Sequence, residues 1–178
     1  MARYARRMAV ALTFTLLSGP GRVLASEADA VAAAAASPIE RVKALAGEWV
    51  AAEDGDMAKK GDLVARYAVT AAGSAVVETV FPGSRHEMVT VYHADGPDLV
   101  LTHYCIDRNQ PRMRAKHPQG GRFEFAFDGG TNLDPKRDRH MNSASMEILG
   151  ADEIKSVWTE LEGGKIVFVA RTHLVRKR

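Results

Sequence analysis

Residues 86–128 read HEMVTVYHA-DGP-DLVLTHYCI-DRN-QPRMRAKH-PQGG-RFEFAFD, and this stretch decides the fold. Four strand-like runs are separated by turns of three or four residues that are rich in Gly, Pro, Asp and Asn. Connections this short leave no room for crossover helices. The four runs are therefore predicted to form neighbouring antiparallel strands.

The same pattern continues on both sides of this stretch. The further strand-like runs are EWVAAE, DLVARYAVT and SAVVETVF before it, and SASMEIL, DEIKSVWTEL and KIVFVARTHLVRK after a polar loop at 129–140. SPIERVKALAGEW predicts one short helix, with a capping box formed by Ser37 and Glu40 and with Pro38 at the first helical position. The sequence predicts an all-β fold, an antiparallel up-and-down barrel of about ten strands preceded by one short helix. A two-sheet sandwich is the alternative.

The N-terminus has the pattern of an export signal. Three arginines in MARYARR precede a short apolar run, and small residues precede a cleavage site at Ser26. We expect a signal peptide at 1–25, a flexible alanine-rich linker at 26–37 and a lipocalin-like barrel domain at 38–178. The protein is then periplasmic or secreted, with no permanent membrane anchor, because the apolar run is too short to span a bilayer.

The charge of the chain argues against nucleic acid as a partner. The chain has 24 basic and 22 acidic residues, and four of the arginines lie in the predicted signal peptide, which has no acid. The mature chain keeps 20 basic residues against the same 22 acids, a net charge of −2. No basic domain remains to bind a phosphate backbone. The sequence does not predict the oligomeric state.

The run 101–115, LTHYCIDRNQPRMRA, is the candidate ligand site. Arg112 and Arg114 share one face of a strand and Met113 lies on the other. If the arginines point inward, they offer bidentate docking to an anionic group; if they face solvent, Met113 belongs to the core. Both readings stay open. The complete set of candidate ligand-binding residues is His103, Asn109, Gln110, Arg112, Arg114, His86 and His140.

The chain resembles a known group of barrels. LAGEW after a short helix, the run HYCIDRNQPRMRA, and the later TNLD and RHM are similar to bacterial lipocalin-like, or calycin-like, proteins of uncharacterised function. The resemblance implies a ligand-binding barrel and no established catalytic residues. Nitrobindins share the barrel more distantly and bind haem through a histidine near the C-terminus. His173 lies in about that region, but EWVAAEDGD lacks their glycine-rich segment.

These observations predict a protein that binds a small, partly apolar ligand with a polar or anionic group. Phe123, Phe125 and Phe127, or the opposing strands, would form the apolar wall. An enzyme that uses His103 or His86 as acid or base is one alternative, a haem-binding barrel is another, and an envelope-structural protein with a filled barrel is a third. No catalytic residue, metal site or cofactor is expected, although haem stays open through the nitrobindin resemblance.

Overall fold

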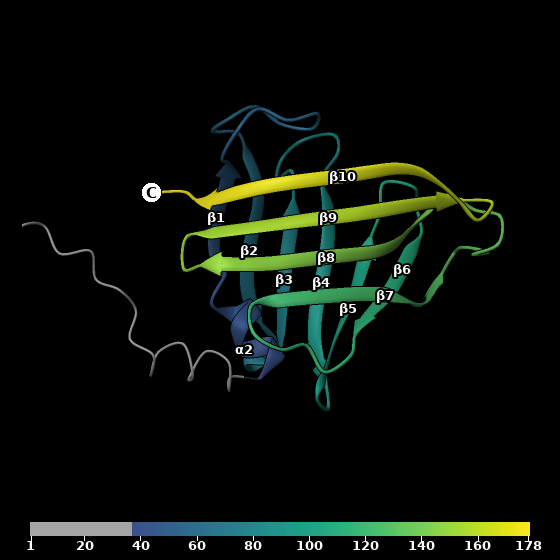
Figure 1. The fold of residues 1–178 in the computed structure, drawn as a ribbon, viewed down its shortest axis with the longest axis horizontal. Coiled ribbons are helices and arrows are strands. Elements are labelled where there is room, and N and C mark those ends of the chain that lie inside the picture. Colours follow the sequence, from purple (N-terminus) through teal and green to yellow (C-terminus); the bar gives the residue numbers. More distant parts are fainter. Residues whose placement is uncertain (1–36) are drawn as a thin grey trace, which may run out of the picture.

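The computed structural model describes residues 37–178, and its strands form one closed barrel (Figure 1). All ten strands are antiparallel and each pairs with its neighbours in sequence, while the last strand closes onto the first. The all-β barrel prediction is confirmed. The predicted signal peptide, and all of the predicted linker except Ser37, lie outside the described residues.

The elements follow the predicted order closely. Their bounds are α2 Pro38–Lys43, β1 Gly47–Ala51, β2 Leu63–Thr70, η1 Ala71–Gly73, β3 Ala75–Val80, β4 Met88–Asp95, β5 Asp98–Tyr104, β6 Gln110–Ala115, β7 Arg122–Thr131, β8 His140–Gly150, β9 Glu153–Glu162 and β10 Lys165–Arg176. The polar loop is shorter than expected because β7 continues to Thr131, which leaves residues 132–139 between the strands.

In this up-and-down topology, successive connections lie at alternate ends of the barrel. Helix α2 lies across one end, where it contacts β2, β3, β4 and β5 (Figure 1). Because successive strands alternate in direction, the connections 52–62, 81–87, 105–109 and 132–139 all gather at the opposite end. We call this opposite end the mouth of the barrel.

Helix α2 closes its end with an apolar face. Ile39, Val42 and the following Leu45 are buried in the main core. The predicted capping box does not form: the Ser37 side chain makes no cap hydrogen bond, and the Glu40 carboxylate pairs instead with Lys43 at 2.6 Å. Within residues 37–178 no helix has the length and apolar character needed to cross a membrane.

The alternation of side chains decides what faces the interior. Phe123 and Phe125 of β7 are buried, as are Leu101 and His103 of β5 and Met113 of β6. Their sequence neighbours on the same strands point outward, as the two-residue period of a strand requires. The interior is therefore apolar with a few polar positions.

The barrel wall is thin at one seam. Strand β1 is short and pairs with β10 at only three positions, from Trp49↔Arg176 to Ala51↔Leu174. Past Ala51 the chain leaves the sheet as the 52–62 connection, so no strand is paired to the earlier part of β10 on that side. At this seam the interior lies next to a loop instead of a strand.

Candidate functional site

The interior holds a small cavity near the mouth. Its volume is about 60 Å³, space for roughly two water molecules at about 30 Å³ each. The wall is mostly apolar, and methionine is its most frequent residue type. The methionines are Met57, Met88, Met141 and Met146, and the other lining residues include Val64, Ala65, Val80, Phe81, Ile154, Trp158, Ala170 and Leu174.

A buried carboxyl forms the first polar group of the cavity. Glu78 of β3 accepts hydrogen bonds from the Tyr67 hydroxyl at 2.8 Å and from the Tyr92 hydroxyl at 2.6 Å. Burial raises the pKa of Glu78 above its ordinary value, while the two phenol donors act in the opposite direction. Burial, followed by the nearby Glu78 charge, holds the pKa of both tyrosines well above the usual range, so both stay protonated donors.

A buried imidazole forms the second polar group. His103 of β5 is 3% exposed, and its Nδ1 lies 2.9 Å from the Thr90 hydroxyl of β4. Its Nε2 has no hydrogen-bond partner among residues 37–178. Burial lowers the pKa of His103 to about 4, so the ring is neutral at neutral pH. The Trp158 ring of β9 packs against it at a centroid distance of 5.1 Å.

These polar groups form one row across four strands. Tyr67 pairs with Glu78, Glu78 with Thr90, and Thr90 with His103 in the registers of β2 to β5. Adjacent strands lie about 4.8 Å apart, so the row crosses one side of the interior as a continuous polar belt. Mostly apolar side chains of β8, β9 and β10 line much of the rest of the cavity.

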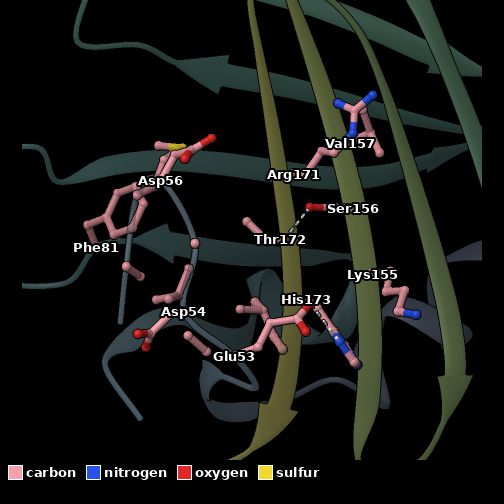
Figure 2. A pocket seen from close by; sticks show the side chains of 16 residues that line it. Glu53, Asp54, Asp56, Phe81, Lys155, Ser156, Val157, Arg171, Thr172 and His173 are labelled. Carbon is pink, nitrogen blue, oxygen red and sulfur yellow. Dashed lines mark hydrogen bonds and ion pairs between the residues drawn. The ribbon is translucent and has the colours of Figure 1, made fainter. Parts of the chain in front are cut away.

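A slot in the wall leads from outside toward this cavity. It lies at the seam beyond β1, has a volume of about 350 Å³, and is bounded by the 52–62 connection on one side and by β9 and β10 on the other (Figure 2). Ser156 and Thr172, joined by a 2.7 Å hydrogen bond, line both the slot and the cavity. The slot and the interior are thus neighbouring spaces.

A second hollow of about 450 Å³ lies at the mouth. Its buried carboxyl, Glu160, pairs with Arg139 at 2.5 Å. Burial raises the pKa of the Cys105 thiol to about 11, and its sulfur lies 3.7 Å from Asp107. A thiol with that pKa is protonated at neutral pH and is a weak nucleophile.

Phe81 and Met57 separate the three spaces. Both line the cavity, the slot and the mouth hollow. Phe81 follows β3 directly and has a φ of 51°, in the left-handed region that bulky side chains rarely adopt. Backbone strain of this kind costs about 1–3 kcal/mol and persists only where its surroundings hold it. The two side chains therefore act as the partition between the interior and the outside.

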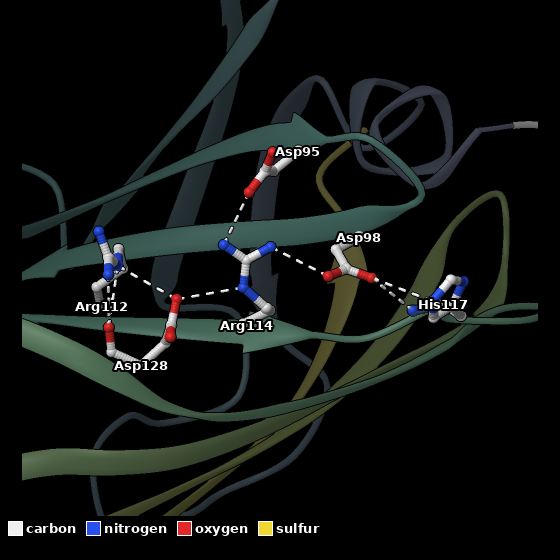
Figure 3. Close-up of polar contacts among 6 residues, drawn as sticks. All are labelled: Asp95, Asp98, Arg112, Arg114, His117 and Asp128. Atoms are coloured by element: carbon white, nitrogen blue, oxygen red, sulfur yellow. Dashed lines mark hydrogen bonds and ion pairs between the residues drawn. The ribbon is translucent and has the colours of Figure 1, made fainter.

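The structure decides between the two readings of Arg112 and Arg114. Met113 and Ala115 occupy the inner face of β6, so Arg112 and Arg114 point to the outer surface. There Arg114 binds the three carboxylates of Asp95, Asp98 and Asp128 at 2.8 to 3.2 Å (Figure 3). Arg112 binds the Asp128 main-chain carbonyl oxygen and lies 3.3 Å from its carboxylate. Both guanidiniums join strands to one another, and neither lines the cavity.

The other candidate residues divide between the interior, the mouth and the outer face. Gln110 shares the outer face of β6 and accepts hydrogen bonds from Thr131 and Asn132. Asn109 is buried and donates to the Arg139 carbonyl at 2.7 Å, which ties the start of β6 to the 132–139 loop.

Two of the predicted histidines also lie away from the cavity. His140 is buried beside Phe127, with Nδ1 2.7 Å from the Asp138 carbonyl oxygen. His86 is exposed beside the mouth hollow, where Arg85 donates to it. Of the seven predicted residues, His103 alone is found on the cavity wall.

The described residues do not fit a haem or a bound metal. His173 points out of the barrel, and its Nε2 lies 2.7 Å from a Glu153 oxygen. The cavity of about 60 Å³ is far smaller than a haem macrocycle. In the part of the chain that the structure describes, no group of three or more His, Cys, Asp or Glu side chains is arranged to hold a metal ion.

Sequence reasoning missed most of the polar belt. Glu78 is a charged residue within the otherwise strand-like run SAVVETVF, and it has the same parity as the buried Val76. Residues two apart on a strand point to the same face, so the burial expected of Val76 could have indicated that the Glu78 carboxyl points inward. Its hydrogen bonds to Tyr67 and Tyr92 could not be read from sequence because they depend on the register of β2, β3 and β4.

The fold and this site define a class of protein: a closed antiparallel β-barrel with a small apolar cavity crossed by a polar belt. No family model matches the chain, and no curated protein is significantly similar to it. The function must therefore be argued from the site itself.

Proposed function

We propose that this chain is an exported β-barrel protein of the calycin-like kind that binds a small, partly apolar molecule inside the barrel. The observation that carries the proposal is His103 Nε2, a buried polar atom without a partner among residues 37–178, on the wall of an apolar cavity. Buried polar atoms are normally hydrogen-bonded, and small-molecule sites place a few polar groups in a mostly apolar wall.

The lining allows the cavity to enlarge around a ligand. Typical small-molecule sites have volumes of about 300–1,000 Å³, larger than the closed interior. Methionine side chains are flexible and repack readily, and Met57, Met88, Met141 and Met146 all face the cavity. Displacement of Met57 and Phe81 joins the interior to the slot of about 350 Å³. A ligand would enter there.

Export is the second part of the proposal. It rests on the charged start, the apolar run and the small residues before Ser26. N-terminal sequencing of the protein isolated from its own host tests it. A mature chain that begins near Ser26 is expected, and a product that still begins at Met1 or Ala2 contradicts cleavage.

Native mass spectrometry tests the binding function. The protein purified from its own host is compared with the same protein after denaturation and refolding without added small molecules. A retained mass that disappears on refolding supports the proposal and identifies the ligand. A bare protein mass in both samples, together with no binding of the probes described below, contradicts it.

One observation favours a second candidate function. The closed interior is nearly full, with a cavity of about 60 Å³, and a filled barrel suits an envelope-structural protein that binds other macromolecules. An acid–base enzyme is less well supported. His103 is oriented by a Thr90 hydroxyl and not by a carboxylate, and its pKa of about 4 makes it a weak base at neutral pH.

A further inference from the structure

The direction of the Thr90–His103 hydrogen bond decides what His103 presents to the cavity. Thr90 is fully buried, and His103 Nδ1 is the one hydrogen-bond partner of its hydroxyl found among residues 37–178. If the hydroxyl donates to Nδ1, both groups are satisfied. If Nδ1–H donated instead, the hydroxyl hydrogen would be buried without an acceptor, at a cost of about 1–3 kcal/mol. The donating hydroxyl is favoured, so the ring proton lies on Nε2.

His103 lines the cavity, and its Nε2–H is then a buried hydrogen-bond donor without a partner among residues 37–178. The ring is held from two sides, by the Thr90 hydroxyl at Nδ1 and by the Trp158 ring at a centroid distance of 5.1 Å. A ring fixed in this way cannot turn its N–H toward another protein group without losing the bond to Thr90. Its natural partner is an acceptor atom on a molecule in the cavity.

The charges around the cavity exclude an anion. No lysine or arginine is among the described residues that line it, and Glu78 is its one carboxyl group. A carboxylate or phosphate would be buried beside Glu78 without a counter-charge, which is strongly unfavourable. An ammonium group has donors only, so it would leave the Nε2–H of His103 unpaired.

We propose that the cavity takes an uncharged, largely apolar molecule with one hydrogen-bond acceptor, of the carbonyl type, which accepts from His103 Nε2. This inference rests on the proposed binding function and specifies its ligand class. It replaces the anionic ligand that the arginine pair suggested, because those arginines lie outside the barrel.

Three probes of nearly equal size and shape test the ligand class. Acetophenone carries a neutral carbonyl oxygen, α-methylstyrene replaces that oxygen with a methylene group, and benzoate carries a negative charge. Binding is followed by NMR of the methionine methyl groups. Met88, Met141 and Met146 line the cavity, whereas Met113 is buried elsewhere in the core and serves as the internal control.

The full chain is expected to bind acetophenone about tenfold more tightly than α-methylstyrene, the effect of one hydrogen bond to a buried donor. Benzoate should produce no saturable shifts. His103→Phe keeps an aromatic ring against Trp158 and removes the donor, so its affinities for the two neutral probes should agree within about threefold. Arg112→Met, on the outer surface, should keep the wild-type preference.

A measurement on the wild-type protein covers the case in which His103→Phe does not fold. Long-range ¹H–¹⁵N correlation of the imidazole should show the proton on Nε2, and its resonance should move when acetophenone is added. The ligand class is overturned if the proton is on Nδ1, if benzoate binds as tightly as acetophenone, or if His103→Phe keeps the tenfold preference. Equal binding of both neutral probes overturns the ligand class but leaves the binding function. If no probe shifts Met88, Met141 or Met146, the ligand class fails, and the binding function fails with it when native mass spectrometry also shows only the bare protein mass.

Discussion

The Thr90 hydroxyl lies 2.9 Å from Nδ1 of His103, and the two residues are direct partners in the register of β4 and β5. Thr90→Val keeps the shape of the side chain and leaves Nδ1 buried without a partner. We expect the free energy of unfolding to fall by about 1–3 kcal/mol, the usual cost of a buried polar atom that has lost its hydrogen bond. Urea unfolding measures this change.

Thr102→Val is the matched control for this substitution. Thr102 lies next to His103 on β5, but it faces the outer side and pairs with Arg112. A surface change of this kind should alter the stability by no more than about 0.5 kcal/mol. Equal losses in the two variants would mean that the Thr90–His103 bond does not stabilise the interior.

The low pKa of His103 predicts a loss of stability in acid. The pKa is about 4 in the folded protein against 6.5 for a free histidine, so the unfolded chain binds the proton more tightly between these values. The neutral His103 ring contributes its full stabilisation of the folded protein above pH 6.5. This stabilisation is lost as the pH falls toward 4, by up to about 3 kcal/mol. Glu78 acts in the opposite sense, because its raised pKa favours the folded state at low pH.

Comparison of variants separates these two contributions. Urea unfolding at several values between pH 7 and 4 should show a shallower pH dependence for His103→Phe than for the wild type. Substitution of the exposed His86 by Gln is the control for removing a histidine outside the interior. If the free energy of unfolding of His103→Phe changes with pH as steeply as that of the wild type, the buried imidazole titrates normally.

The outer arginines should contribute to stability and not to ligand binding. Among residues 37–178, Arg114 forms ion pairs with three carboxylates, from β4, β5 and β7, whereas Arg112 forms one, with Asp128 (Figure 3). Arg114→Met should therefore lower the melting temperature by roughly 2–4 °C, more than Arg112→Met. The difference should shrink in 1 M salt because surface charges are screened. A weakened acetophenone affinity in either variant would contradict the outward placement.

The barrel could be predicted from sequence because each strand and each short turn is a local pattern. The site could not, because it depends on register. In β6, Arg112 and Arg114 alternate with Met113 and Ala115, and both faces could be read as functional; burial of Met113 decides the question. Glu78 and His103 lie on strands on either side of Thr90, so only the pairing of β3, β4 and β5 makes these residues neighbours.

Phe81 should control how fast a ligand reaches the interior. Its side chain lines the cavity, the slot and the mouth hollow, and its φ of 51° suits glycine better than phenylalanine. Phe81→Gly removes the partition and relieves the backbone. We expect the association rate of prodan, a neutral fluorescent naphthyl ketone dye, to rise by about an order of magnitude, because binding no longer waits for a side chain to move. Stopped-flow fluorescence measures the rate.

Ala72→Gly is the control for the relief of strain alone. Ala72 also has a positive φ, of 52°, but it is exposed in the turn between β2 and β3 at the α2 end, far from the mouth. This variant relieves the backbone without opening the interior, so its association rate should equal that of the wild type. If Phe81→Gly also binds the dye at the wild-type rate, Phe81 is not a barrier and a ligand must enter elsewhere. If both variants accelerate binding, backbone relaxation and not the missing ring is the cause.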